Sequence, residues 1–453
     1  MIESYKSFIQ LYQNNFVEPL NKQFCKLLEN YSFYFISDIA VFDQNTIIKE
    51  RFKESNVSLI DILIDNCSTY FVVVIENDKY VKFINALITF DPNIIEKDIN
   101  TAIELYILAA NQNIEKAQYE LGSIYYEGKY VKRDIEKSIH YYTFAANQNN
   151  VNAQFNLGFI YEENKYFKCD INKSIYYYSL AANQNDIQAQ CNLGYIYSSG
   201  EFIEPDFKKA FHYYSLAAEQ NEPNSLYELG NIYFSGKDVK QDIEKAINYF
   251  TLAADKNHIY AQFELGRLYH EGIYIPLDLS KAIHYLSLAS KQNHPYSQFN
   301  LGIIYLNSKF IAQDINKAIK YFQQAAENNI SEAQFNLGLI FDTCEYVSHN
   351  INKSIYYYSL AASQNNVDAQ YNLGLIYFRG QSVHFDIQKA IYFFTLAANQ
   401  NDAKAQFKLG NIYEKGEHIK LDIQKAIHYY TLAADQNLKD WQLIKMMFFH
   451  KSS

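Results

Sequence analysis

Residues 333–362 read AQFNLGLIFDTCEYVSHNINKSIYYYSLAA, and near-copies of this stretch recur along most of the 453-residue chain. Its Leu337-Gly338 pair has eight equivalents, spaced by a constant 36 residues without insertion or deletion. The leucines of this series are Leu121, Leu157, Leu193, Leu229, Leu265, Leu301, Leu337, Leu373 and Leu409. A fixed period of this size is typical of a solenoid, in which one helix-turn-helix unit needs its neighbours to bury its apolar face.

Each unit predicts two helices, which we call helix A and helix B. In helix A, Ala333, Leu337, Ile340 and Phe341 fall on one face at helical spacing. Helix B follows Asn350, and the other units carry Asp at this place. A short carboxylate or amide there accepts the unpaired N–H groups of the first helical turn. The sequence therefore predicts an all-α fold, a right-handed α-solenoid of helix-turn-helix repeats.

All 15 glycines fall at two positions of the repeat. Nine follow the repeated leucine inside helix A, where Gly costs roughly 1 kcal/mol against Ala, so they predict the close approach of a neighbouring helix. The other six end helix A, where a left-handed residue is favoured: Gly128, Gly200, Gly236, Gly272, Gly380 and Gly416. Three units carry Asn164, Ser308 and Cys344 instead, which predicts strained or different turns at the Ser and the Cys.

These residues resemble the Sel-one-like repeat (SLR), a relative of the tetratricopeptide repeat. The family pattern is A-x-x-x-L-G-x-x-Y-x-x-G, a hydrophobic residue, then D-x-x-K-A-x-x-Y-Y-x-x-A-A. One unit matches it with Ala261, Leu265, Gly266, Tyr269, Gly272, Ile275, Asp278, Lys281, Ala282, Tyr285 and Ala289. The resemblance covers residues 98–434. Two features differ: Trp is missing before the second Tyr, and Asn stands after the Ala pair, as in AANQN, where the family has Gly. Asn can also end a helix.

The ends of the chain depart from the repeat. We expect the solenoid to span residues 80–434, with a degenerate helix A at about 80–90 before the nine Leu-Gly units, and residues 435–453 to form a C-terminal cap. Residues 1–79 form a divergent region that we expect to be mostly helical, with a strand or a buried helix around residues 70–75.

Composition narrows the possible partners. The net charge is −10, with 40 basic and 50 acidic residues and no Lys/Arg block, so we expect no nucleic-acid partner. The five cysteines form no CxxC motif, which favours a reducing, cytoplasmic or nuclear location. The N-terminus lacks the pattern of a secretory signal, and the apolar runs are too short to cross a bilayer. We therefore expect no membrane insertion.

No pattern of residues indicates catalysis. The sequence lacks the P-loop, the dinucleotide fingerprint, the HExxH motif and the GxSxG elbow. His140, His212, His284 and His428 share one position of helix B, but two repeats place neighbours roughly 20 Å apart, too far to share a metal. We predict that the protein is not an enzyme and that it has no cofactor, catalytic residue or metal-binding residue.

One column of helix A is almost entirely aromatic. The resemblance implies that helix A lines the concave face of the solenoid, and the column reads Tyr119, Phe155, Cys191, Tyr227, Phe263, Phe299, Phe335, Tyr371 and Phe407. These rings either pack against adjacent A helices or face a partner. Apolar neighbours extend the column over three units and predict a protein-binding groove. Its residues are Phe299, Ile303, Leu306, Phe335, Leu339, Tyr371, Leu375 and Phe378.

The sequence therefore predicts a non-catalytic scaffold or adaptor that binds peptide segments or partner helices of other proteins on the concave face. The alternative is a dedicated regulatory subunit or activator of a single enzyme, which contacts that enzyme through the N-terminal region.

Overall fold

The structure is a computed structural model of the whole chain. It describes four strands between residues 33 and 88, then residues 103, 106–107, 110–111, 113–163, 169–237, 239–307, 312–343, 348–381 and 383–434. Two compact units divide the chain, residues 1–225 and residues 226–453.

The N-terminal unit begins with an antiparallel sheet. Its strands are β1 (Phe33–Ile36), β2 (Ile60–Ile64), β3 (Thr69–Glu76) and β4 (Tyr80–Ile88), in the order β1-β2-β3-β4. Strand β3 covers residues 70–75, where a strand was one of the two expectations. The expectation of a mostly helical region is wrong for β1 and β2, and the degenerate helix A at 80–90 is wrong because this segment is strand β4. The physical reason is the dense Val, Ile and aromatic content of β3 and β4, which favours strands, whereas the helical prediction followed the register of the repeats.

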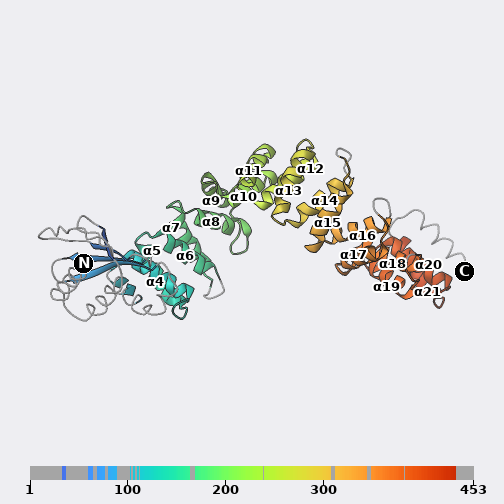
Figure 1. Cartoon of the computed structure of the whole chain (residues 1–453), viewed down its shortest axis with the longest axis horizontal. Helices are drawn as coiled ribbons and strands as arrows, with labels where there is room; N and C mark the ends of the chain where they lie inside the picture. Colours follow the sequence, from blue (N-terminus) through green and yellow to red (C-terminus); the bar gives the residue numbers. More distant parts are fainter. Residues whose placement is uncertain are drawn as a thin grey trace. The chain divides into compact units, whose positions relative to one another are not determined.

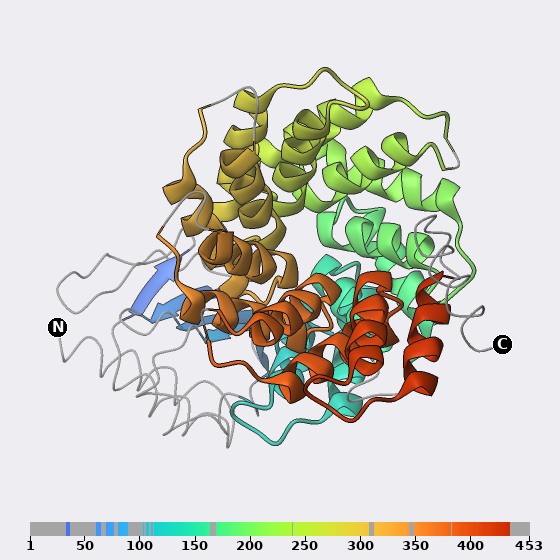
Figure 2. The same ribbon diagram turned by 90° about the vertical axis from the view of Figure 1, so that its right-hand side faces the viewer.

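The described residues from 115 to 434 form eighteen helices in pairs, an all-α solenoid as predicted (Figure 1). The A helices are α4 (Glu115–Glu127), α6 (Val151–Glu162), α8 (Ile187–Ser199), α10 (Pro223–Ser235), α12 (Ile259–Glu271), α14 (Pro295–Asn307), α16 (Ser331–Thr343), α18 (Val367–Arg379) and α20 (Ala403–Lys415). The B helices are α5 (Ile135–Asn147), α7 (Ile171–Ala182), α9 (Phe207–Glu219), α11 (Ile243–Asp255), α13 (Leu279–Lys291), α15 (Ile315–Glu327), α17 (Ile351–Ser363), α19 (Ile387–Asn399) and α21 (Ile423–Ala434). In both compact units helix B packs on its own helix A and on the next helix A, as α5 does on α4 and α6 and α17 does on α16 and α18 (Figure 2).

The helix ends follow the predicted chemistry. Asp134 caps α5 by accepting the N–H of Lys137 at 3.0 Å, and Asn350 caps α17 in the same way at 3.1 Å. The six loop glycines all have positive φ, between 63° and 69°. Asn164, Ser308 and Cys344 lie outside the described residues. The second Asn of AANQN ends the B-helix segment with φ between 61° and 68° in nine repeats, so Asn takes the left-handed place that Gly commonly fills.

The helix A glycine lies directly under a ring of helix B. A Cβ built on Gly338 would stand 2.4 Å from Cδ1 of Tyr358, which is fully buried. The other repeats place Tyr or Phe over this glycine, except for Leu286 over Gly266. The predicted close approach is therefore confirmed, and it joins the two helices of one repeat.

A buried glutamine ties three successive helices together. Gln334 of α16 donates to the carbonyl oxygen of Ala326 in α15 at 3.2 Å and accepts a hydrogen bond from Gln364, just after α17, at 2.8 Å. The same two bonds form around Gln154 and Gln370. These amides satisfy one another where water is excluded, so they fix the register of adjacent repeats.

We expect Gly338→Ala to destabilise repeat 331–366 by about 1 to 3 kcal/mol, because the new methyl group overlaps the Tyr358 ring and a buried ring cannot move aside. In an open helix the same change would stabilise by roughly 1 kcal/mol. Hydrogen exchange of α16 and α17 measures the effect, with the exposed Asn352→Ala in α17 as the control. Unchanged protection in the glycine variant would show that the contact is loose.

Candidate protein-binding surface on the A helices

The aromatic column of helix A is partly buried against helix B. The rings of Phe299, Phe335 and Tyr371 lie 5.9, 5.7 and 5.7 Å from the rings of Phe322, Tyr358 and Phe394. Each pair belongs to one repeat. The packing alternative therefore describes much of this column, because the rings pack against B-helix rings and against core clusters that include residues of the next helix A.

The residue in the last turn of helix A matches the polarity of the same B-helix ring. Where the ring is Tyr178, its hydroxyl donates to Glu162 at 2.8 Å, and Tyr430 donates to Glu414 in the same way. Burial raises the pKa of Tyr178, and the adjacent Glu162 carboxylate raises it further, so this tyrosine stays protonated. The hydroxyl needs a polar partner, which the last turn supplies.

Where the B-helix ring is Phe, the residue in the last turn of helix A is apolar. Leu306 faces Phe322 in the core and is only 7% exposed. The Phe378 ring lies 6.4 Å from Phe394. The apolar character of both residues thus serves the interior of the repeat, and Leu306 offers no surface to a partner.

Three of the eight predicted residues form an apolar strip, defined as Ile303, Leu339 and Leu375. They occupy one position of α14, α16 and α18, which contact one another in succession. Leu339 is 37% exposed, and the other two are half-buried. The strip is therefore a narrow surface rather than the broad groove that eight residues would line.

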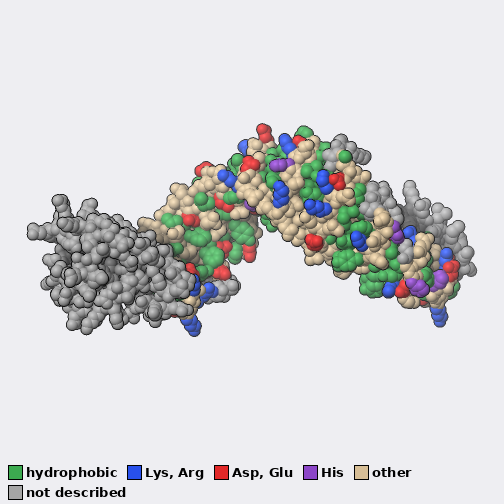
Figure 3. Space-filling view, in the orientation of Figure 1, with side chains coloured by type: hydrophobic (Ala, Val, Ile, Leu, Met, Phe, Trp, Pro, Cys, Tyr) green, Lys and Arg blue, Asp and Glu red, His purple; other side chains and the backbone are tan. Residues whose placement is uncertain are grey.

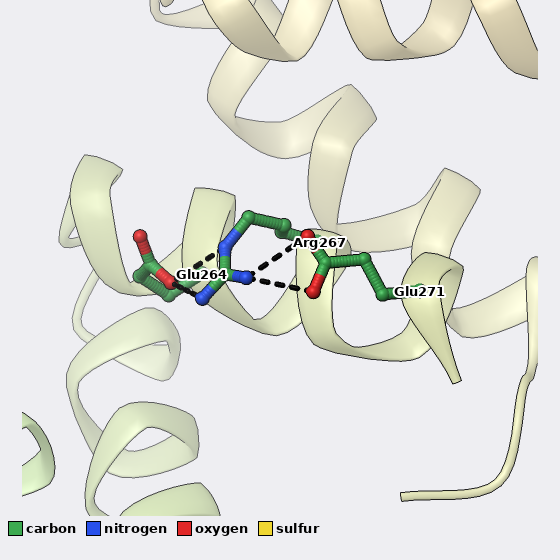
Figure 4. A network of polar contacts seen from close by, with 3 residues as sticks. All are labelled: Glu264, Arg267 and Glu271. Atoms are coloured by element: carbon green, nitrogen blue, oxygen red, sulfur yellow. Dashed lines mark hydrogen bonds and ion pairs between the residues drawn. The ribbon is translucent and has the colours of Figure 1, made fainter. Parts of the chain in front are cut away.

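A charged cluster borders the strip. Arg267 occupies the equivalent position of α12, and its guanidinium contacts Glu264 at 2.7 Å and Glu271 at 2.8 Å (Figure 4). All three side chains come from one helix. The other border is Asn411 in α20. The apolar strip is thus three repeats long and ends in polar side chains on both sides.

The same column carries exposed aromatics in the N-terminal unit, which the sequence analysis did not single out. Phe159 of α6 is 39% exposed and Tyr195 of α8 is 48% exposed. Both side chains are more exposed than that of Leu339. The sequence alone could have indicated them, since an alignment of the repeats places both in the column of Ile303. Hydrophobic side chains are interspersed with charged ones over the face drawn in Figure 3.

The histidine row of helix B forms no cluster among the described residues. His140, His212, His284 and His428 are each exposed. Among the described residues, no three His, Cys, Asp or Glu side chains lie where they could hold a metal ion. No helix in the described part of the chain is both long enough and apolar enough to cross a membrane.

A different histidine caps helix A. The Nδ1 atom of His294 accepts the N–H of Ser297 at 3.2 Å, at the place where α6 and α18 use Asn150 and Asn366. The imidazole is buried, with its ring 4.6 Å from that of Phe263. Nδ1 can accept this hydrogen bond only when the ring is neutral. Burial lowers the pKa of His294 and so favours the neutral ring.

We expect the α14 cap to weaken as the pH falls below about 6.5. Below this pH the imidazole of His294 binds a proton more readily in the unfolded chain than in the folded one. The contribution of the cap to the free energy of unfolding is therefore fully present above this pH and is lost as the pH falls below it. Amide exchange at Ser297, corrected for the intrinsic pH dependence, should show rising local opening between pH 7 and pH 5. In His294→Asn this rise should disappear, because Asn caps without titrating. Equal slopes in both proteins would contradict the role of the imidazole.

Comparisons with known proteins agree with the repeat geometry. A family model for the Sel1 repeat matches residues 91–114 and then nine consecutive segments from 115–150 to 403–438. The crystal structure of a protective antigen from uropathogenic Escherichia coli strains, with an SLR fold, is 30% identical, covers 79% of this chain and 76% of its own, and has a TM-score of 0.67. A Sel1 repeat protein from Oxalobacter formigenes is 29% identical, covers 68% and 90%, and has a TM-score of 0.56. The comparison with curated proteins found no match.

The matched segments run from residue 91 to residue 438, which is well over half of the chain. They coincide with the helix pairs described above, including the capped B helices and the glycine under the B-helix ring. The protein belongs to the Sel1 repeat family.

Proposed function

We propose that the protein is a non-catalytic scaffold or adaptor that binds peptide segments or partner helices of other proteins across its A helices. Sel1 repeat proteins generally mediate protein–protein interactions and are typically non-catalytic. The observation that carries the proposal is the apolar strip, in which Leu339 is exposed and Ile303 and Leu375 are partly exposed on three consecutive A helices.

The spacing of the strip suits a helical or extended partner. Packed helices lie about 8 to 10 Å apart, and seven residues of an α-helix rise roughly 10.5 Å. A partner helix crossing α14, α16 and α18 would therefore present one apolar residue to each, at positions i, i+7 and i+14. A segment in the polyproline II conformation, with three residues per turn and roughly 3.1 Å per residue, would do so every three residues. Either partner would cover Ile303, Leu339 and Leu375 together.

The remaining predicted residues take supporting roles in this proposal. Phe299, Phe335 and Tyr371 form the half-buried floor beside the strip, whereas Leu306 and Phe378 support the core of their repeats. The alternative, a regulatory subunit that contacts one enzyme through residues 1–79, stays a prediction, because the side chains of that region lie outside the described residues.

The test is a triple variant, Ile303→Asp, Leu339→Asp and Leu375→Asp. Carboxylates at these positions replace apolar contact with charges that a docked apolar segment would desolvate, which should weaken binding at least tenfold. Quantitative affinity purification with the full-length chain, followed by titration of each recovered partner, measures the loss.

The matched control changes three exposed apolar residues of the B helices, Tyr356→Asp, Tyr392→Asp and Leu432→Asp, with the same change in charge. Circular dichroism and thermal melting confirm that both variants fold. If the strip variant retains every partner and the control loses them, the binding surface lies on the B helices and the proposal is wrong.

A further inference from the structure

The A-helix face of α6 and α8 carries a second exposed surface with a different chemistry. Phe159 and Tyr195 stand at equivalent positions of these two helices, which contact each other, and both rings are exposed. We call Phe159, Glu162, Tyr195 and Glu201 the anionic aromatic face. All four residues belong to the N-terminal unit.

Two carboxylates border the exposed rings. Glu162 accepts a hydrogen bond from the hydroxyl of Tyr178 at 2.8 Å, and Glu201 accepts one from the hydroxyl of Tyr195 at 3.0 Å. Burial raises the pKa of Glu162, and the nearby charge of Glu201 raises it further. Among the described residues, neither carboxylate forms an ion pair. Within the described part of the chain, no cation therefore balances their negative charges.

The chain itself shows which group fits a ring beside a carboxylate. In unit 1 the ammonium of Lys173 lies 3.7 Å from Asp170 and 4.9 Å from the centre of the Tyr161 ring. Lys209 repeats this arrangement. At the anionic aromatic face the carboxylates and the rings are present without such a lysine among the residues that the structure describes.

We propose that the anionic aromatic face binds a lysine- or arginine-bearing segment of a partner protein. The proposal rests on the proposed function, since it assumes that the A helices receive protein segments. A cation between Glu162 and Glu201 relieves the repulsion of the two carboxylates and contacts the faces of Phe159 and Tyr195. The apolar part of the same side chain covers the rings.

Charge complementarity selects this occupant over the alternatives. An acidic segment would be repelled by the two carboxylates, and a purely apolar one would desolvate Glu162 further without supplying a cation. A calcium ion takes six to eight oxygen ligands, whereas the described residues offer no cluster of three acidic or other metal-binding side chains here.

The experiment uses the full-length chain and a fluorescein-labelled ten-residue peptide of alternating Leu and Lys, titrated by fluorescence anisotropy at 150 mM NaCl. The double variant Glu162→Gln, Glu201→Gln removes both charges and keeps the oxygen acceptors. We expect the Kd to rise at least tenfold. The matched control is Glu136→Gln, Glu219→Gln, which makes the same charge change on exposed residues of α5 and α9 and should shift the Kd less than twofold.

A second variant covers the rings. Phe159→Ser removes an exposed ring without touching the carboxylates and should raise the Kd at least threefold; it also decides the question if the double variant fails to fold. Equal weakening by the two glutamine pairs, no effect of Phe159→Ser, or equal binding of a Leu-Glu peptide would overturn the proposal.

The strip variant Ile303→Asp, Leu339→Asp, Leu375→Asp separates this inference from the proposed function. The Leu-Lys peptide should bind it within twofold of the parent chain. Failure of the peptide to bind the parent overturns the anionic aromatic face, and the partner titrations with the strip variant still decide the scaffold function.

Discussion

The contact between the helix A glycine and the helix B ring is the constraint on which each repeat depends. Because any Cβ at Gly338 would enter the Tyr358 ring, helix A can approach helix B at one register only. One added residue would rotate helix A by about 100° and put another side chain under the ring. The contact explains the constant spacing between glycine and ring, as in Gly338 and Tyr358 or Gly374 and Phe394, because an added residue within either helix would move one partner away from the other.

The ring also determines the chemistry of the surface above it. A tyrosine at this place carries its hydroxyl to the edge of the core, where Glu162 or Glu414 accepts a hydrogen bond from it. A phenylalanine needs no such partner, and Leu306 then closes the core beside Phe322. The presence or absence of the tyrosine hydroxyl on helix B is thus coupled to whether the last turn of helix A carries a polar or an apolar residue. An apolar residue in that turn is explained by the packing of the core and is not evidence for a partner.

This coupling explains which features the sequence could predict. The caps at Asp134 and Asn350 and the glycine contact depend on local chemistry at fixed spacing, so the pattern alone predicted them. The exposure of Leu306 depends on its packing against Phe322, which lies 16 positions later in the chain. Helical geometry alone does not include this packing, so the predicted exposure of Leu306 was wrong. Strand β4 was missed because register with the repeats outweighed its strand-forming composition.

The column of Ile303 differs from the rest of the repeat in how much it varies. The column that includes Leu337 is invariant across nine repeats, whereas the column of Ile303 reads Ser123, Phe159, Tyr195, Asn231, Arg267, Ile303, Leu339, Leu375 and Asn411. A side chain beyond the glycine–ring contact can change from aliphatic to aromatic or cationic without moving either helix. Each repeat can therefore present its own chemistry on a common backbone. Within one chain this permits an apolar strip on α14, α16 and α18 and an anionic aromatic face on α6 and α8, each with its own side-chain chemistry.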